Sequence, residues 1–195
     1  MRGIVRSLGM AGMFALCAAG SALAQHPQRR EGFWIGFGFG YGSADVKSDT
    51  IPAAATRESG PTGFIKLGGA LSKKVLLGGE VNAWRKSESG ATFTIGNVSA
   101  AAYFYPAPAT GFFLKGGVGF ADFRISVDNG GSATATGFGF LTGLGYDIRV
   151  GKNISLTPVF NFYFGSDGDL KSNGTTIDSH YKHNVYDFGL GITFH

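Results

Sequence analysis

Large apolar residues alternate with glycine or polar residues over several stretches of the chain. The clearest stretch, residues 186–194, has large apolar side chains at its even positions and small or polar side chains at its odd positions. Residues 33–42 repeat the alternation, with aromatic or apolar odd positions facing an unbroken run of glycines at positions 36, 38, 40 and 42. A period of two is typical of a β-strand, and no helical period fits either stretch.

Eight such stretches are expected to be strands. They are residues 33–42, 62–71, 75–84, 91–105, 111–123, 135–149, 154–164 and 186–194. Long polar segments follow the first, third, fifth and seventh of these, and short turns follow the second, fourth and sixth. An even number of strands joined in this alternating way is typical of outer-membrane barrels, and each strand is near the length needed to cross a bilayer. The sequence therefore predicts an all-β fold, an eight-stranded antiparallel up-and-down transmembrane β-barrel.

The direction of the apolar face separates this fold from a soluble barrel. A lipocalin-type barrel would hold its aromatic residues inside, around a ligand. Here that arrangement would place roughly forty large side chains in a lumen that eight strands barely leave open. The chain has 33 glycines in 195 residues, well above the usual share of about 7%, and they lie mainly opposite the apolar row. We therefore expect lipid against the apolar face and a narrow bore lined by glycine and scattered charges.

The N-terminus has the pattern of an export signal. Arg2 and Arg6 supply a positive start, residues 8–19 an apolar core, and residues 22–24 a small-x-small cleavage site. We expect residues 1–24 to be a cleaved signal peptide and residues 25–195 to be one barrel domain. The only cysteine, Cys17, would leave with the signal, which excludes disulfides, zinc-thiolate sites and cysteine catalysis in the mature chain. The net charge falls from +4 to about +2, too weak and dispersed for nucleic acid.

Strand parity places several ionisable residues inside the barrel. A hairpin centred on Lys73 would set Lys66 directly opposite Glu80, so an interior cation would pair with an interior anion. The complete interior set expected from parity has three residues of each sign: Lys66, Glu80, Lys115, Asp147, Arg149 and Asp187. An unpaired charge in a dry lumen costs several kcal/mol, so a balanced set is required. We expect these residues to tie the strands together and fill the bore.

Three local features carry further expectations. The apolar parity of residues 91–105 changes near Gly96 and Asn97, which predicts a β-bulge there. Pro158 removes one ladder hydrogen bond and predicts a second local distortion. The side chains expected to form an aromatic girdle at the membrane surface are Tyr41, Trp84, Phe123 and Tyr181.

With these features the chain resembles the small eight-stranded outer-membrane barrels of Gram-negative bacteria, the family of the OmpA membrane domain, OmpX and the opacity-type surface proteins. The resemblance covers the whole mature chain, mostly as pattern. Its most specific part is the terminal signal polar-x-Gly-x-x-apolar-x-aromatic, matched by Asp187, Gly189, Ile192 and Phe194. The family implies that the barrel-assembly machinery recognises this signal, although here His195 follows the aromatic residue. It also implies a location in the outer membrane and a monomer.

The first functional hypothesis is a non-enzymatic outer-membrane protein that presents four extracellular loops for envelope structure or surface interaction. Its partners would be outer-membrane lipid, lipopolysaccharide, and a host or surface ligand bound by the loops. Arg85, Lys86, Arg124 and Lys182 lie near the expected outer rim, where they could bind lipid phosphates or remain solvated. The bore could instead conduct ions or small solutes, which would make the protein a small channel.

A lipid A-modifying enzyme is the remaining alternative. A deacylase would need a histidine base and a serine nucleophile in a His-x-Ser pair at the rim. The run of residues 178–183 contains Asp, Ser and two His, but without that spacing. His180 and His183 could share a metal, yet no third ligand is in view. We therefore expect no catalytic, cofactor-binding or metal-binding residues.

Overall fold

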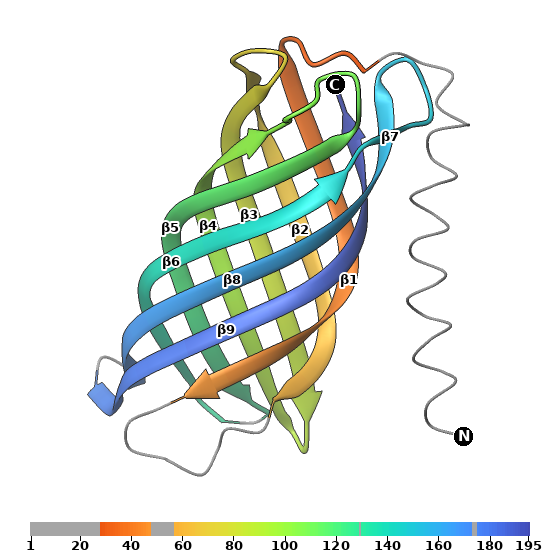
Figure 1. The fold of residues 1–195 in the computed structure, drawn as a ribbon. Helices are drawn as coiled ribbons and strands as arrows, with labels where there is room; N and C mark the ends of the chain where they lie inside the picture. Colours follow the sequence, from red (N-terminus) through yellow and green to blue (C-terminus); the bar gives the residue numbers. More distant parts are fainter. Residues whose placement is uncertain (1–27, 48–56, 129, 173–174) are drawn as a thin grey trace, which may run out of the picture.

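The computed structural model describes residues 28–47, 57–128, 130–172 and 175–195. Their strands follow one another in antiparallel order around a single sheet, and the first strand pairs with the last, so the sheet closes into a barrel (Figure 1). The predicted signal peptide, residues 1–24, lies outside the described residues. Within the described ranges no helix is long and apolar enough to cross a bilayer.

The strands in chain order are β1 (Phe33–Lys47), β2 (Glu58–Ala70), β3 (Val75–Glu88), β4 (Ala91–Phe104), β5 (Phe112–Val127), β6 (Ser132–Tyr146), β7 (Ile148–Arg149), β8 (Ile154–Ser172) and β9 (Thr175–Phe194). The short β7 continues β6 after a break at Asp147, and both pair with β8. The barrel wall therefore has eight strand positions, with β6 and β7 together forming one of them. We call each strand position a stave. The predicted all-β, eight-stranded antiparallel barrel is confirmed.

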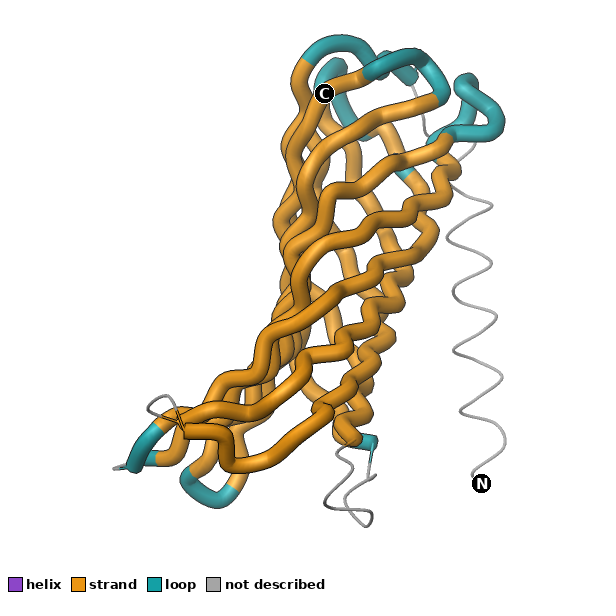
Figure 2. The backbone as a smooth tube through the Cα atoms, turned by 90° about the vertical axis from the view of Figure 1, so that its left-hand side faces the viewer, coloured by secondary structure: helices purple, strands orange, loops and turns teal. Residues whose placement is uncertain are grey.

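The barrel is a tilted cylinder whose connections differ at its two ends (Figure 2). The short turns after β2, β4 and β7 lie at one end, which also holds His195 at the end of β9. In outer-membrane barrels the short turns face the periplasm, and the hairpins of the opposite, extracellular end project farther. At that opposite end, among the connections between the described strands, only residues 48–57 form a long one; the other hairpins there project because their strands extend past the lipid-facing row. We call the two ends the periplasmic and extracellular ends.

Strands continue well into segments that the sequence pattern assigned to loops. β8 runs to Ser172 and β9 begins at Thr175, so this hairpin covers most of the connection predicted between residues 164 and 186. β3 and β5 likewise extend to Glu88 and Val127. The strands continue past the end of the lipid-facing apolar row, because a strand in water needs only a hydrogen-bonded neighbouring strand.

The register of the β2–β3 hairpin is the predicted one, with Lys66 opposite Glu80. The bulge predicted near Gly96 and Asn97 is wrong, because β4 keeps one unbroken register with β3 and with β5 from Ala91 onward. The change of parity in β4 has a different cause. Ile95 is buried inside the barrel and Val98 faces lipid, so the apolar side changes from one face to the other along a regular strand.

Pro158 interrupts the ladder without shifting it. On one side it pairs in register with Leu190 of β9. On the other side it lies between the pairs Gly145–Val159 and Ile148–Leu156, which keep the same register across the gap separating β6 from β7. The predicted local distortion at Pro158 is therefore present as a break in the ladder between β6 and β7, without a bulge. On its other side Asp147 continues the register of β6 with β5, because its N–H donates to the carbonyl of Gly111 at 2.9 Å.

The bore is too narrow for side chains at several glycine positions. A Cβ on Gly38 would lie 2.6 Å from the Cα of Gly191 and 2.6 Å from the Phe64 ring. On Gly68 it would lie 2.0 Å from the carbonyl oxygen of Leu77. Glycine at these inward positions lets the neighbouring staves and the large interior rings approach closely.

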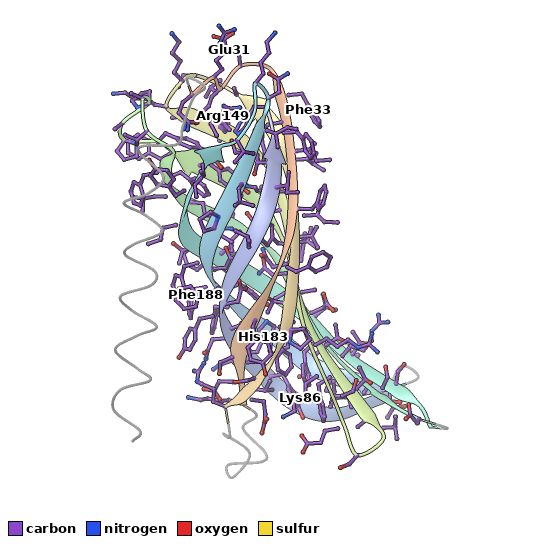
Figure 3. All side chains as sticks on the ribbon, turned by 90° about the vertical axis from the view of Figure 1, so that its right-hand side faces the viewer. Glu31, Phe33, Lys86, Arg149, His183 and Phe188 are labelled. Atoms are coloured by element: carbon purple, nitrogen blue, oxygen red, sulfur yellow. The ribbon has the colours of Figure 1, made fainter. Side chains whose placement is uncertain are left out.

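The predicted aromatic girdle is wrong for three of its four residues. Trp84, Phe123 and Tyr181 point inward and are buried, and only Tyr41 is exposed on the outer surface. Phe188, by contrast, projects outward at mid-height (Figure 3). Phe123 lies one position out of step with the lipid-facing residues of β5, so parity would have placed it inside.

Candidate functional site

The six ionisable residues predicted for the interior all lie inside the barrel. None is more than 5% exposed: Lys66, Glu80, Lys115, Asp147, Arg149 and Asp187. They do not form one continuous set. They divide into a central group around Glu80, a contact between Asp187 on β9 and Asn161 on β8, and a group at the periplasmic end.

Glu80 is the centre of the first group. Its carboxylate accepts hydrogen bonds from the Lys115 ammonium and from the Tyr103 hydroxyl, and Lys115 forms its ion pair. Both side chains of the ion pair are at most 1% exposed. A buried pair of this kind depends on both partners, because removing one leaves the other charged and desolvated.

Lys66 does not form the ion pair that the hairpin register suggested. Its ammonium lies over three rings, 5.0 Å from the centroid of Phe113, 5.5 Å from that of Tyr103 and 5.8 Å from that of Trp34. Aromatic faces attract a cation through their quadrupole. The backbone register places Lys66 opposite Glu80. The ion pair of Glu80 is nevertheless formed by Lys115, which lies on β5 and not on the neighbouring β2.

Asp187 forms a separate contact with β8. Its carboxylate accepts a hydrogen bond from the Asn161 side-chain amide at 2.9 Å, and the two residues are cross-strand partners. Asn82 is buried on β3 without a hydrogen-bond partner for its side chain among the described residues.

Asp147 is the centre of the periplasmic group. Its carboxylate accepts hydrogen bonds from the Tyr105 hydroxyl at 2.8 Å and from the Thr157 hydroxyl at 2.8 Å. The Nε2 atom of His195 lies 3.7 Å from the same carboxylate. Burial lowers the pKa of His195 to about 4, with the nearby Asp147 opposing this shift. His195 is therefore neutral at pH 7 and packs into the periplasmic end.

Arg30 is a buried cation that sequence reasoning missed. It precedes β1, so no strand parity applies to it, yet its side chain is folded into the periplasmic end and only 3% exposed. Its guanidinium lies 3.6 Å from the centroid of the Tyr105 ring. The described interior thus holds four cations, one more than the predicted three, against three carboxylates. Only the tertiary structure could reveal this residue.

The interior changes character toward the extracellular end. We call outer extension the strand residues beyond the outward row of Ala83, Gly96, Asp122 and Thr136, which are successive cross-strand partners. Inside the outer extension Ile95 is fully buried, and the rings of Phe123 and Tyr181 stack with centroids 5.4 Å apart. The side chains that share this apolar cluster include Trp84, Ala135, Leu170 and Val185.

The rim cations predicted to contact lipopolysaccharide lie on the outer extension. Arg85, Arg124 and Lys182 are exposed and, among the described residues, have no carboxylate within ion-pair distance. Lys86 differs from them, because it lies on the same face of β3 as buried Trp84 and forms ion pairs with Glu58 and Glu88. It lies far from Arg149 along the barrel axis (Figure 3).

Two of these cations share one outward row just beyond the lipid-facing surface. Arg85 pairs across the sheet with Thr94, and Thr94 pairs with Arg124. Arg124 pairs in turn with Thr134, which pairs with exposed Lys171. Lys171 is not among the predicted rim cations, because its segment was expected to be a loop.

The residues of the predicted assembly signal lie on the periplasmic half of β9. Asp187 and Gly189 face the bore, whereas Ile192 and Phe194 face outward and are each 38% exposed. Phe194 is the last residue of the strand and pairs with both Ile35 and Ile154. Recognition of this segment by the assembly machinery stays a prediction.

Histidine chemistry finds little support in the placement of these residues. His183 points into the bore in the outer extension and is 1% exposed (Figure 3). The side chain of His180 lies outside the described part of the chain. In the part that is described, no three His, Cys, Asp or Glu residues are arranged to hold a metal ion.

Closed antiparallel staves, an outward apolar surface and a narrow charged bore define an integral outer-membrane barrel. The chain belongs to the outer membrane protein beta-barrel domain family, whose model matches residues 13–194. The protein is therefore a small β-barrel of the outer membrane. A search of curated proteins found no match to the chain.

Solved structures of small barrels have the same fold. Neisserial surface protein A matches with a TM-score of 0.55 and 17% identity, covering 84% of this chain and 97% of its own. Ail of Yersinia pestis, solved with the heparin analogue sucrose octasulfate, matches at 0.53 and 18%, covering 84% and 99%. OprG of Pseudomonas aeruginosa matches at 0.50 and 16%, covering 86% and 98%. At these identities the similarity establishes the fold.

Proposed function

We propose that this protein is a non-enzymatic surface barrel with a closed bore, and that its outer rim binds the phosphate groups of lipopolysaccharide. The observation that carries the proposal is the row of outward cations at the boundary of the lipid-facing surface. Arg85 and Arg124 lie in that row without carboxylate partners among the described residues. The barrel thereby serves as an anchor that positions its outward connections for contact with the envelope or with surface ligands.

The chemistry of the row suits an anionic headgroup. Arg85 and Arg124 are separated by one strand, so their backbones lie about 10 Å apart. Thr94 between them and Thr134 beside them offer hydroxyl donors. Guanidinium groups bind phosphate oxygens through paired hydrogen bonds. The row also lies directly above lipid-facing residues such as Val98 and Phe120, where the phosphates of an outer-leaflet lipid are found.

The proposed phosphate-binding cations include Lys182, on the other side of the barrel, but not Lys86. Lys182 is exposed on β9 beside Lys47, its cross-strand partner on β1. Two neighbouring cations repel. Lys47 lies 3.8 Å from the Asp45 carboxylate, whereas Lys182 has no carboxylate partner among the described residues. Lys86 is already neutralised by Glu58 and Glu88, so a phosphate would have to displace those carboxylates.

The filled bore supports anchoring over conduction. Side chains from strands that are not neighbours in the sheet meet inside the barrel, including the ion pair of Glu80 and Lys115 and the ring contact of Trp34 with Tyr103, whose centroids lie 4.9 Å apart. An eight-stranded barrel leaves an interior that side chains fill. A stable single-channel current in planar bilayers would favour the channel hypothesis instead.

The proposal is tested by binding of purified lipopolysaccharide to the folded protein in mild detergent. We expect the double variant Arg85→Gln/Arg124→Gln to bind at least tenfold more weakly than the parent, because two phosphate contacts are lost. The matched control is Lys73→Gln/Lys74→Gln, which removes two exposed cations at the opposite end of the barrel. Equal binding by all three proteins would refute the rim site.

The enzymatic alternative is tested by the acyl-chain composition of lipid A. Lipid A from cells with and without the protein is compared by mass spectrometry. We expect the acyl count to be unchanged, and an altered count would overturn the non-enzymatic assignment.

A further inference from the structure

We infer that the periplasmic end of the barrel contains a guanidinium-binding site that the chain fills with its own Arg30. Filling this site fastens residues 28–30 across the mouth as a strap that closes the bore from the periplasm. The strap residues are Gln28, Arg29 and Arg30. The inference concerns the opposite end of the barrel from the proposed lipopolysaccharide site, so either can fail without the other.

The Arg30 side chain is held from three directions. Its Nη2 donates a hydrogen bond to the Thr110 carbonyl at 2.7 Å, and its Nη1 donates to the Pro108 carbonyl at 2.9 Å. Its planar group covers the Tyr105 ring at 3.6 Å. These partners belong to the turn between β4 and β5 and are about eighty residues away in sequence. The side chain is nevertheless almost completely buried.

The same strap is fastened to the other side of the mouth. The carbonyl of Arg29 accepts a hydrogen bond from Arg149 Nη2 at 2.7 Å, and the Gln28 side-chain amide donates to the Asp147 carbonyl at 2.9 Å. The strap thus links the β4–β5 turn to the end of the β6–β7 stave. In Figure 3, Arg149 lies at the same end of the barrel as Glu31 and Phe33, the residues that follow the strap.

The arrangement of partners selects a guanidinium group. Two carbonyl oxygens receive separate nitrogens of one planar cation, whose face simultaneously covers an aromatic ring. A lysine ammonium is a compact point charge that cannot stack in this way. The ring that is covered belongs to Tyr105, whose hydroxyl donates to buried Asp147. The site therefore offers an aromatic ring to the face of the guanidinium group and carbonyl acceptors to its nitrogens. Through the Tyr105 hydroxyl it is also linked to the interior charge of Asp147.

The closure is tested with a single reporter thiol. Ser155 is fully buried on β8 beside its cross-strand partner Arg149, and its hydroxyl has no hydrogen-bond partner among the described residues, so Ser155→Cys removes no hydrogen bond of the described structure. In a Cys17→Ser background this thiol is the only one in the chain. We expect a charged methanethiosulfonate to modify it at least tenfold faster after Arg30→Ala, because water reaches the mouth once the strap is released.

Two companion variants and one added compound identify the cause. Arg30→Lys should also release the strap, because it keeps the charge but loses the planar group. Glu31→Ala changes the exposed neighbour and should leave labelling slow. Ethylguanidinium at a non-denaturing concentration should slow labelling in Arg30→Ala again, because it can occupy the vacated site, whereas ethylammonium should not.

Folding of each variant is checked by heat-modifiable mobility on gels, which reports the closed barrel independently of the strap. Unchanged labelling in folded Arg30→Ala would overturn the closure. Slow labelling in Arg30→Lys, or no effect of ethylguanidinium on labelling of Arg30→Ala, would overturn the guanidinium-binding site. If Arg30→Ala does not fold, Arg30→Gln provides the same comparison with a side chain of similar length.

Discussion

The membrane-spanning part of the barrel and its outer extension use opposite sides of the same strands for apolar residues. In the membrane the outward side is apolar, with residues such as Val98 and Phe120, while the inward side carries glycine and charges such as Glu80 and Lys115 among a few packed rings such as Phe113. In the outer extension the inward side carries Ile95, and the outward side carries Thr94 and other polar residues. β4 passes from one arrangement to the other without losing register.

The difference follows from what lies outside the sheet. Lipid accepts apolar side chains, so within the membrane the hydrophobic residues are free to face outward and the bore holds the polar groups. Beyond the membrane the outer surface faces water, and burial of apolar area stabilises only the inside. The outer extension is therefore built like a soluble barrel that continues a membrane barrel. Its packed interior explains why the strands extend so far past the lipid.

The largest expected effect distinguishes a buried ion pair from an exposed one. Glu80→Gln keeps the size of the side chain but leaves Lys115 charged in the membrane-spanning interior, and we expect it to lower the free energy of unfolding by about 3–5 kcal/mol. Glu58→Gln removes one of the two carboxylates paired with Lys86 in the outer extension. The Glu58 and Lys86 side chains are 46% and 25% exposed, so solvent screens this pair and the cost should be much smaller than that of Glu80→Gln. Urea unfolding in lipid vesicles measures both, and equal costs would contradict the distinction.

A matched pair of isoleucines tests the inversion itself. Ile95 is fully buried in the outer extension, whereas Ile65 is 54% exposed on the lipid-facing side of β2. Ile95→Ala should cost about 2–5 kcal/mol, because it leaves a cavity in a packed interior. Ile65→Ala should cost distinctly less, because acyl chains fill the space and only the transfer free energy is lost. A larger cost at Ile65, measured by the same unfolding experiment, would show that the apolar sides have been assigned wrongly.

The smallest effect concerns the two sides of the membrane-spanning wall. Gly38 faces the bore, and a Cβ there would meet backbone atoms of β9 as well as the Phe64 ring. Gly38→Ala should therefore destabilise the barrel by about 1–3 kcal/mol. Gly69 faces outward, where a Cβ would lie 4.0 Å from its nearest neighbour, the Gly32 carbonyl oxygen, and Gly69→Ala should be neutral or slightly stabilising. Comparable losses at both positions, measured by the same unfolding experiment, would argue against a filled bore.

The fold could be read from the chain because its signal is repeated eight times. A period of two combined with glycine on one face has no soluble interpretation at this barrel size, so the strand order, the closure and the β2–β3 register followed. The wrong predictions concern the start of the outer extension, where the apolar residues change from the outward to the inward side of the strands. The parity change in β4 resembled a bulge, and Trp84, Phe123 and Tyr181 resembled a membrane girdle, because we expected every aromatic residue near the rim to face lipid.

The candidate sites were only partly predictable for a related reason. Parity placed six charged residues inside, but it gives no information about which long side chain reaches which partner. Lys66 lies opposite Glu80 in the ladder, yet the carboxylate accepts from Lys115. The row from Arg85 to Arg124 required the registers of two strand pairs, and two further pairs brought in Lys171 from a segment expected to be a loop.

The local pattern of the chain was sufficient to specify an outer-membrane barrel of eight strands, the side of each membrane-spanning strand that meets lipid, and the six interior charges that lie on those strands. Those properties depend on near neighbours in sequence and on the two solvents that the sheet separates. The partners of the buried charges, the apolar interior of the outer extension and the position of Arg30 depend on contacts between residues far apart in sequence. Arg30 lies about eighty residues from the carbonyls that bind it, and only closure of the barrel brings them together.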